Sequence, residues 1–382
     1  MPSASSGPLI IVSANQAWNL VNFRAGLIRS LIGAGFRVLA TAPPDPAMEA
    51  RLSEMGASFA PIRIDSKGLK PHHDVATFLA LRRLIAKHRP AAWLSWTIKP
   101  NVYGSLAAGL AGVPAFPNVS GLGTAFIRKN LLTVLAKAFY RAGFFRAPTV
   151  FFQNNDDRQE FVGGGLVRSS QAVVLPGSGI DPQDWSPPPG GRPASRQFLM
   201  LSRVVADKGV REYVAAAAQI KARWPDARFI LMGELGSANR TAIPLAEVRS
   251  WIESGVIEHA EPVADVRPAI AAADFVVLPS YREGLSRVLL EAAAMGRPIV
   301  TTNVTGCRDI VSEGVNGFLC KARDAESLAA ALARAAQTTD SDWRRMADAG
   351  RALVLRDFSQ ARVTQLYLAA LARAGVVPDN PA

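Results

Sequence analysis

The residues best suited to chemistry in this chain are two glutamates, Glu283 and Glu291, which lie eight positions apart. Gly284 follows the first of them, and a glycine lets a ligand approach the backbone closely. Ser286 is a favourable first residue for a helix, and the amino terminus of a helix favours anions. The pattern predicts a ligand-facing turn flanked by two carboxylates. A purely structural strand-to-helix turn with a solvated glutamate is the alternative.

Two cations form a second candidate group, because Arg203 and Lys208 lie five positions apart and next to Gly209. Arginine can bridge two oxygens and lysine supplies a point charge, so the pair suits a diphosphate. Gly233 follows another apolar run and could approach a nucleotide. Surface charge is the alternative interpretation of Arg203 and Lys208 when they are taken alone.

Polar residues in the first half of the chain also follow apolar runs. Lys99 and Asn101 come after the run at 91–96, while Ser120 and Gly121 come after the run at 115–119. In open α/β sheets, ligands bind at the carboxyl ends of the strands. These residues are therefore candidates for a binding site, although a structural turn explains Ser120 and Gly121 equally well.

The elements that must position these candidates are short apolar strands alternating with helices, which predicts an α/β fold with parallel sheets. In the first half we predict strands at 9–14, 36–42, 59–64, 91–96, 115–119 and 149–153, with a helix at 23–34. In the second half we predict strands at 198–201, 228–232, 275–278 and 298–302, with helices at 287–295 and 342–375. Residues 173–193 are rich in proline and glycine and read as a linker. A chain of 382 residues suits two domains, which we place at 1–175 and 176–357.

These motifs resemble those of family 4 retaining glycosyltransferases, which have the two-domain GT-B fold. Glu283, Gly284 and Glu291 carry the resemblance, which extends over the sequences GCRDIV at 306–311 and NGFL at 316–319. It implies two Rossmann-like parallel-sheet domains that face each other across a cleft. It also implies that the first domain binds the acceptor, that the second binds the donor, and that a helix at about 358–382 packs back on the first domain.

The resemblance implies transfer of a sugar from a nucleotide diphosphate, with a UDP-linked hexose or N-acetylhexosamine as the expected donor. Arg203 and Lys208 would hold the diphosphate and stabilise the leaving group, and Glu283 would hold the sugar hydroxyls. These three are the implied catalytic residues. The implied donor-binding residues are Glu291 at the ribose, Gly233, and the backbone amides of Gly284, Leu285 and Ser286.

Residues 97–104 and 118–126 are similar to the subgroup that builds bacterial capsule, O-antigen and glycan-carrier saccharides, including N-acetylgalactosaminyltransferases acting on undecaprenyl-diphosphate-linked sugars. This similarity implies a polyprenyl-diphosphate-linked saccharide as acceptor. The sugar-proximal residues would be Lys99, Asn101, Ser120 and Gly121. The sequence departs from the family in two places: the first loop, at 13–18, lacks the usual glycines, and Ser120 stands where many members have histidine.

The positive charge of the chain lies almost entirely in its first half. Residues 1–175 contain 19 lysines and arginines against 8 acidic residues, which leaves +11 of the total net charge of +12. Such a half implies an anionic partner. Residues 127–146 combine five cations with apolar bulk and contain no acid, so they are a candidate for contact with an anionic membrane, and a helix packed into its own domain is the alternative. We expect no signal peptide and no transmembrane helix, and we expect a peripheral location on the inner face of the bacterial cytoplasmic membrane.

Several other function classes are disfavoured by the sequence. It contains no complete GxGxxG or GxxxxGK motif, which disfavours a hydride-transfer enzyme and a kinase. Cys307 and Cys320 have no metal-ligand spacing, and the sequence Asp340-Ser341-Asp342 reads as a helix cap, so we expect no metal site and no cofactor. The alternatives that remain are a UDP-N-acetylglucosamine 2-epimerase and an inactive sugar-nucleotide-binding relative. A nucleic-acid-binding protein would explain the charge, but it would not explain Glu283 and Glu291.

Overall fold

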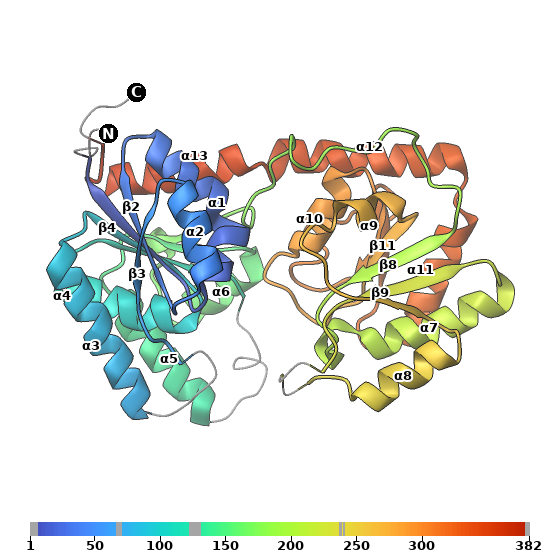
Figure 1. The fold of residues 1–382 in the computed structure, drawn as a ribbon, viewed down its shortest axis with the longest axis horizontal. Helices are drawn as coiled ribbons and strands as arrows, with labels where there is room; N and C mark the ends of the chain where they lie inside the picture. Colours follow the sequence, from blue (N-terminus) through green and yellow to red (C-terminus); the bar gives the residue numbers. More distant parts are fainter. Residues whose placement is uncertain (1–6, 66–70, 122–130, 237–238, 240, 379–382) are drawn as a thin grey trace. The chain divides into compact units, whose positions relative to one another are not determined.

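The chain folds into two compact units, each built around one parallel sheet (Figure 1). A computed structural model describes residues 7–65, 71–121, 131–236, 239 and 241–378. The first unit contains Met1–Gly179 together with Gln360–Ala382, and the second contains Ile180–Ser359. The predicted class, two α/β domains with parallel sheets, is confirmed.

The sheet of the first unit has seven parallel strands in the order β3-β2-β1-β4-β5-β6-β7. Their bounds are β1 Leu9–Ser13, β2 Arg37–Ala42, β3 Ser58–Pro61, β4 Ala92–Trp96, β5 Ala115–Val119, β6 Val150–Phe152 and β7 Ala172–Val174. Every residue of β4 and β5 is buried, as expected for central strands covered by helices on both faces. The last strand predicted for this half, at 149–153, is not the last strand of the sheet, because β7 adds a further strand through pairs such as Phe151 with Val173.

Helices cover both faces of this sheet because successive side chains of a strand point in opposite directions. Ile10 and Val12 pack in a core with α1 (Ala17–Gly33) and α13 (Gln360–Arg373), whereas Ile11 packs in a core with α3 (Pro71–His88) and α4 (Ser105–Leu110). The C-terminal helix α13 is therefore part of the first unit, and the ring of its Tyr367 packs 4.4 Å from that of Phe151. The helical bounds are α1 Ala17–Gly33, α2 Pro46–Glu54, α3 Pro71–His88, π-helix η1 Pro100–Gly104, α4 Ser105–Leu110, α5 Leu131–Phe144, α6 Asn155–Gly163, short helix η3 Ser169–Gln171 and α13 Gln360–Arg373.

The sheet of the second unit has six parallel strands in the order β10-β9-β8-β11-β12-β13. Their bounds are β8 Gln197–Leu201, β9 Arg228–Met232, β10 Glu258–Ala260, β11 Phe275–Leu278, β12 Ile299–Thr302 and β13 Gly317–Cys320. The predicted bounds of β9 and β11 are confirmed, but the two edge strands β10 and β13 were not predicted. All residues of β8 and β11 are buried, so these two neighbouring strands form a rigid base for the loops that follow them.

The long helix predicted at 342–375 is two helices, so that prediction is corrected. Helix α12 ends at Asp357 and α13 begins at Gln360. The break coincides with a long-range contact, because the Ile180 amide donates to the Phe358 carbonyl at 2.9 Å. The helical bounds of this unit are η4 Ala206–Lys208, α7 Val210–Arg223, α8 Leu245–Glu253, α9 Arg267–Ala272, α10 Arg287–Ala294, α11 Ala325–Gln337 and α12 Asp340–Asp357.

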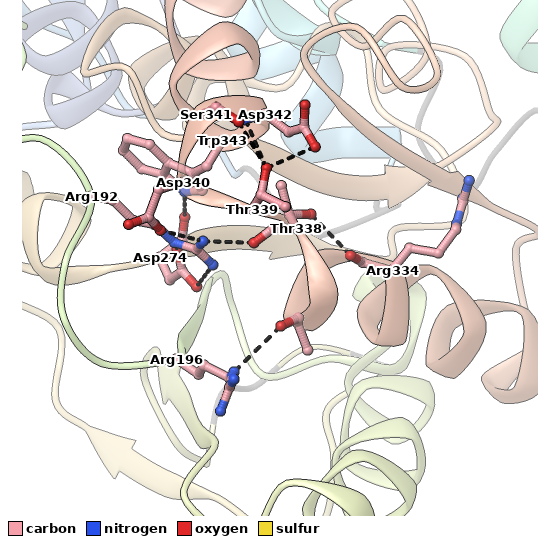
Figure 2. A network of polar contacts seen from close by, with 11 residues as sticks. Arg192, Arg196, Asp274, Arg334, Thr338, Thr339, Asp340, Ser341, Asp342 and Trp343 are labelled. Carbon is pink, nitrogen blue, oxygen red and sulfur yellow. Dashed lines mark hydrogen bonds and ion pairs between the residues drawn. The ribbon is translucent and has the colours of Figure 1, made fainter.

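A polar network at the start of β11 and of α12 fastens the linker to the second unit (Figure 2). The Arg192 guanidinium binds both carboxylate oxygens of the buried Asp274, at 2.9 and 3.0 Å. It also donates to the Thr338 carbonyl at 2.7 Å, and the Trp343 indole donates to the Asp274 carbonyl at 2.9 Å. Burial raises the pKa of Asp274, and the Arg192 charge opposes that rise. The network lies at the amino end of β11, opposite the end at which the candidate site begins.

The Asp340-Ser341-Asp342 sequence forms the first turn of α12, so its interpretation as a helix cap is corrected by one residue. Thr339 is the capping residue, and its hydroxyl accepts from the Asp342 amide at 3.2 Å. The same hydroxyl donates to the Asp342 carboxylate at 2.9 Å (Figure 2). Within the described residues, no three histidine, cysteine, aspartate or glutamate side chains gather as a metal site requires.

Candidate active site

Helix α10 begins directly after the turn that carries Glu283. Ser286 caps it, since its backbone is extended and its hydroxyl accepts from the Leu289 amide at 3.5 Å. Leu289 and Leu290 are buried in the core of the unit and fix the first turn of the helix. The predicted cap at Ser286 is confirmed, and the Glu283 turn is anchored on its helical side.

A second loop, which follows β12, holds the Glu283 turn from the other side. The Glu283 amide donates to the Thr305 carbonyl and the Ser286 amide donates to the Gly306 carbonyl, both at 3.0 Å. Gly306 has φ of 78°, and a Cβ atom there would lie 2.5 Å from the Glu283 carbonyl oxygen. This close approach requires glycine. The expected phosphate cradle is corrected at Ser286, because its amide is already bonded within the protein.

The Glu283 carboxylate forms an ion pair with the Lys208 ammonium, and both side chains are mostly buried. Lys208 ends the short helix η4 after β8, and Gly209 follows with φ of 74°. A Cβ atom at Gly209 would lie 2.1 Å from the Pro279 carbonyl oxygen, so the loops after β8 and β11 pack directly together. The structure thus joins two predicted catalytic residues that are 75 positions apart in sequence.

Arg203 lies on the same loop after β8, and its side chain is exposed. The Val205 amide donates to the Arg203 carbonyl at 2.9 Å, which makes a tight turn. Within the described part of the chain, its guanidinium has no hydrogen-bond or ion-pair partner. The loop therefore presents one exposed cation and one cation paired with Glu283.

Glu291 is buried one turn into α10, with 7% of its surface exposed. Its carboxylate accepts from the Arg287 Nε at 2.7 Å, four positions earlier on the same helix. Burial raises the pKa of Glu291, while the charge and hydrogen bond of Arg287 oppose the rise. The carboxylate is therefore held in one orientation by a neighbour that favours its charged form.

Gly233 directly follows β9, at a point where two loops approach closely. A Cβ atom there would lie 1.9 Å from the Ser202 carbonyl oxygen, at the end of β8. The Gly233 carbonyl is hydrogen-bonded to the His259 Nε2 at 2.9 Å. The glycine is thus required by the packing of neighbouring strand ends, which are also where the Arg203 loop begins.

The sequence indicated no role for Tyr281 or Thr305, and it marked Gly306 only as the first residue of GCRDIV in the family resemblance. The Tyr281 hydroxyl donates to the Glu212 carboxylate at 2.6 Å, and burial raises the pKa of Tyr281. Its amide donates to the Asp207 carbonyl at 2.9 Å, so Tyr281 ties the Glu283 turn to the Lys208 loop. The available signal was position, since Thr305 and Gly306 follow an apolar strand next to β11.

In the first unit, Lys99 is held by an ion pair rather than presented to solvent. Its ammonium lies 2.6 Å from the Asp74 carboxylate, and its side chain is 13% exposed. The neighbouring Tyr103 has its pKa raised to about 12, by burial and then by the Asp74 charge. Lys99 thus links the turn after β4 to α3.

Asn101 lies in the interior of the first unit, so its predicted place beside a sugar is corrected. It is 2% exposed, and its side-chain amide donates to the Asn118 carbonyl at 2.7 Å. The Asn118 side chain donates in turn to the Tyr367 hydroxyl of α13 at 2.9 Å. Ser120 is exposed and Gly121 half-buried at the end of β5, where the Ser120 hydroxyl reaches the Asn118 side chain at 3.5 Å.

Two family models match this chain. The model described as "Glycosyl transferases group 1" matches residues 195–338, and the model described as "Glycosyl transferase 4-like" matches residues 10–154. Each match falls within one of the two units, and the first contains Arg203, Lys208, Glu283 and Glu291.

Curated relatives agree with these models. An N,N'-diacetylbacillosaminyl-diphospho-undecaprenol alpha-1,3-N-acetylgalactosaminyltransferase from Campylobacter jejuni is 25% identical over 327 residues, which cover 81% of this chain and 84% of the relative. A glycogen synthase from Mycobacterium tuberculosis is 32% identical over 226 residues, which cover 56% of this chain and 52% of the relative.

Solved structures share the fold. HepE of Anabaena in complex with UDP-glucose has a TM-score of 0.79 at 18% identity, with 96% of this chain and 100% of that chain covered. A glycosyltransferase from Rickettsia africae has a TM-score of 0.78 at 16% identity, with 96% and 98% covered. The paired loops at Glu283 and Lys208, the two family matches and the shared fold lead to one conclusion: the chain belongs to the family 4 glycosyltransferases with the GT-B fold.

Proposed function

We propose that this glycosyltransferase moves a hexose or N-acetylhexosamine from UDP to a saccharide linked to a polyprenyl diphosphate, with retention of configuration. The observation that carries the donor half of the proposal is the ion pair of Lys208 with Glu283 across the loops after β8 and β11, with Arg203 exposed on the same loop as Lys208. Two cations on one loop, one of them paired with a carboxylate of the neighbouring loop, suit a sugar diphosphate, which presents phosphate oxygens next to hydroxyl groups. UDP is chosen because HepE of Anabaena, which has the same fold, is described in complex with UDP-glucose.

The chemistry requires that negative charge developing on the departing diphosphate be stabilised. Arg203 can bind phosphate oxygens with two parallel hydrogen bonds, and Lys208 adds a point charge from the same loop. These groups are positioned by the loops before the reaction begins, which is the condition for effective electrostatic stabilisation. Glu283 accepts hydrogen bonds from hydroxyl groups of the sugar. Glu291, one turn into α10, accepts hydrogen bonds from the ribose hydroxyls.

Retention and independence of metal ions are parts of the same proposal. We propose retention on the strength of the family resemblance, with attack by the acceptor from the face that the diphosphate leaves. Arg203 and Lys208 supply positive charge where other glycosyltransferases use a cation bound by Asp-x-Asp. We therefore propose that no cofactor takes part in the transfer.

The acceptor half of the proposal rests on chemistry and on a relative. The Campylobacter jejuni relative is named for an undecaprenol-diphosphate-linked acceptor, and it matches 81% of this chain. Residues 1–175 carry +11, which complements an acceptor diphosphate and the anionic surface in which its lipid is embedded. We therefore propose catalysis at the inner face of the bacterial cytoplasmic membrane.

The outer face of α5 supports this location. Val134, Leu135 and Phe139 are exposed on the helix and Phe145 follows it directly, with exposed fractions of 42 to 70%. Arg141 is exposed among them, and residues 131–146 contain no acid. An exposed surface of this composition suits the interface of an anionic bilayer. None of the helices in the described part of the chain has the length and hydropathy needed to cross a bilayer.

The decisive experiment incubates the protein with UDP-glucose, UDP-galactose and their N-acetylated forms, and measures release of UDP. We expect release from one donor, faster with a polyprenyl-diphosphate-linked saccharide and unchanged by EDTA. Lys208→Ala should abolish it. Absence of release from every donor would contradict the proposed function, and loss with EDTA that manganese restores would contradict its metal-free form.

A further inference from the structure

The first unit has its own candidate for a ligand site, at the point where its strand order reverses. From β1 the sheet grows in one direction to β2 and β3, and β4 then lies on the other side of β1. In open parallel sheets, ligands bind outside the carboxyl ends of the strands at such a point. The loops that meet there are the one between β1 and α1 and the one after β4, and the Asn15 amide donates to the Thr97 hydroxyl across them at 3.1 Å.

The backbone of Thr97 is strained. Its φ is 70°, in the left-handed region that a β-branched residue rarely adopts. The π-helix η1 begins three residues later, and π-helical turns are frequent at functional sites. Strained residues also cluster at ligand sites, where the surrounding structure holds them. Here the hydrogen bond from Asn15 couples the strained residue to the loop after β1.

Two buried hydroxyl groups lie at the same strand ends. Ser13 and Ser95 are register partners on β1 and β4, and both are fully buried. Neither hydroxyl has a hydrogen-bond partner among the described residues. Buried polar groups are nearly always bonded, so an unbonded pair requires an explanation. Because both serines are fully buried, a water enclosed beneath the two loops would provide one.

Trp18 is the large aromatic side chain at this position. It lies in the first turn of α1, three residues after Asn15, and is 48% exposed. The Phe23 ring meets it edge to face, with centroids 5.2 Å apart and planes at 88°, which fixes its orientation. Ile98, also 48% exposed, follows Thr97 on the other loop. An exposed, oriented ring of this size offers an apolar platform on which a flat ligand face can lie.

We propose that Trp18 binds the saccharide of the acceptor by stacking on a pyranose ring, and that Thr97 positions the loop that carries it. A pyranose has one face rich in C–H groups and hydroxyls around its edge. Trp18 and Ile98 match the apolar face, and the hydroxyls at the edge of the sugar remain free to bond with water or backbone groups of these loops. The inference rests on the proposed function and extends it by naming the acceptor-binding residues.

The first test measures binding without turnover. Glucose, galactose, N-acetylglucosamine and N-acetylgalactosamine are titrated while tryptophan fluorescence is followed. We expect one of them to change the fluorescence of the wild type and of Trp251→Phe, a matched control on α8 in the other unit, and to leave Trp18→Phe unchanged. A change that persists in Trp18→Phe, or no change in the wild type with any sugar, would overturn the assignment.

The second test measures transfer. Trp18→Ala should raise the acceptor KM at least tenfold with little change in kcat or donor KM. Trp18→Phe should have an acceptor KM close to that of the wild type. Thr97→Val, which removes the hydroxyl, should raise the acceptor KM, and Thr97→Ser should not. Unaltered acceptor KM in Trp18→Ala would exclude the platform. UDP release without acceptor tests the donor site separately, so failure of the proposed function is distinguishable from failure of this inference.

Discussion

The Glu283 carboxylate and the Lys208 ammonium neutralise each other across the loops after β8 and β11. A diphosphate that binds Lys208 competes with Glu283 for the ammonium. We therefore predict opposite effects of Glu283→Gln on two measurements. Transfer should fall by about 10²-fold or more, because the amide keeps only one oxygen that accepts hydrogen bonds from the sugar and loses the negative charge. Affinity for UDP should rise by about fivefold, roughly 1 kcal/mol, because Lys208 loses its competing partner.

Calorimetry with UDP and a transfer assay measure the two effects. Glu283→Ala is the companion variant and should behave alike in both. Unchanged transfer with an unaltered melting curve would remove Glu283 from the site, and weaker UDP binding would show that Glu283 supports the diphosphate rather than competing for Lys208.

Arg203 and Lys208 can be tested against a cation elsewhere in the same unit. Replacing either one with alanine should weaken UDP binding by about 1.5–3 kcal/mol, the scale of hydrogen bonds to charged groups. Arg344→Ala is the matched control, because Arg344 is exposed near the amino end of β11, beside the Asp274 network. Calorimetry should show normal affinity in the control, and equal losses in all three variants would indicate a nonspecific charge effect.

We predict that Glu291 lowers the stability of the fold and strengthens the binding of UDP. Burial raises the pKa of Glu291, so the folded chain binds this proton more tightly than the unfolded chain does. Between the ordinary and the raised pKa, stability therefore falls as pH increases. Glu291→Gln should have a higher Tm at neutral pH, with less dependence on pH in the acidic range, and weaker UDP binding. Melting curves at several pH values measure the first effect, and a lower Tm at neutral pH would contradict the sign.

At the residue scale, the sequence predicted hydrogen bonds between neighbouring residues better than hydrogen bonds between residues that are far apart in the chain. The cap at Ser286 was predictable because it depends on three neighbouring residues. The bond from the Ser286 amide to Gly306 was not, because it joins loops after different strands. Asn101 was misplaced for the same reason, since its partner Asn118 is in turn bonded to Tyr367, which is 249 positions from Asn118.

Among the elements, the turn from β11 to α10 depends on a glycine from another loop. Gly306→Ala would place a Cβ atom 2.5 Å from the Glu283 carbonyl, at a φ of 78°. We expect a destabilisation of about 1–3 kcal/mol together with loss of transfer, because the loop must shift and carry Glu283 with it. Gly314→Ala is the control, with φ of 70° and open space around its Cβ position.

Denaturant titrations and transfer assays distinguish strain from displacement. Gly314→Ala should lose some stability from its φ alone and keep its activity. Similar activity in the two variants would mean that the contact between Gly306 and Glu283 does not position the carboxylate.

Central strands were predictable, and of the four edge strands only β3 was. Runs such as FVVL at 275–278 are apolar throughout because both faces are covered, whereas β10 reads EHA and lies at an edge. The break between α12 and α13 has no proline or glycine to mark it. It coincides with the hydrogen bond between Ile180 and Phe358, which lie near the first and the last residues of the second unit.

At the scale of the whole molecule, the resemblance to family 4 glycosyltransferases is confirmed by the family models and the fold. The two-sheet architecture was predictable because parallel α/β units repeat one local pattern. Charge is the other whole-molecule property that the sequence reveals directly, and +11 of +12 falls in residues 1–175. Which of these cations can contact a membrane depends on their exposure at the surface, which only the fold determines.

The face of α5 is the basis of the last prediction, that the protein binds anionic vesicles reversibly. Arg128 and Lys129, which belong to the basic stretch at 127–146, lie outside the described residues. The described part offers Val134 and Phe145, exposed by 64 and 70%, beside Arg141. Burying a side chain such as valine or phenylalanine contributes about 1.5–3 kcal/mol, and each cation near an anionic surface about 1 kcal/mol.

Sedimentation with vesicles of phosphatidylglycerol and phosphatidylethanolamine measures this binding. Val134→Ser with Phe145→Ser should reduce it by at least tenfold, since the loss of two apolar contacts exceeds 1.4 kcal/mol. Val315→Ser with Leu355→Ser is the matched control, because these residues are 56 and 44% exposed in the other unit. Salt should release the wild type in part, because it screens the cations and leaves the apolar contacts. Equal binding of both double variants would move the membrane contact away from α5, and no binding of the wild type at low salt would favour a water-soluble acceptor.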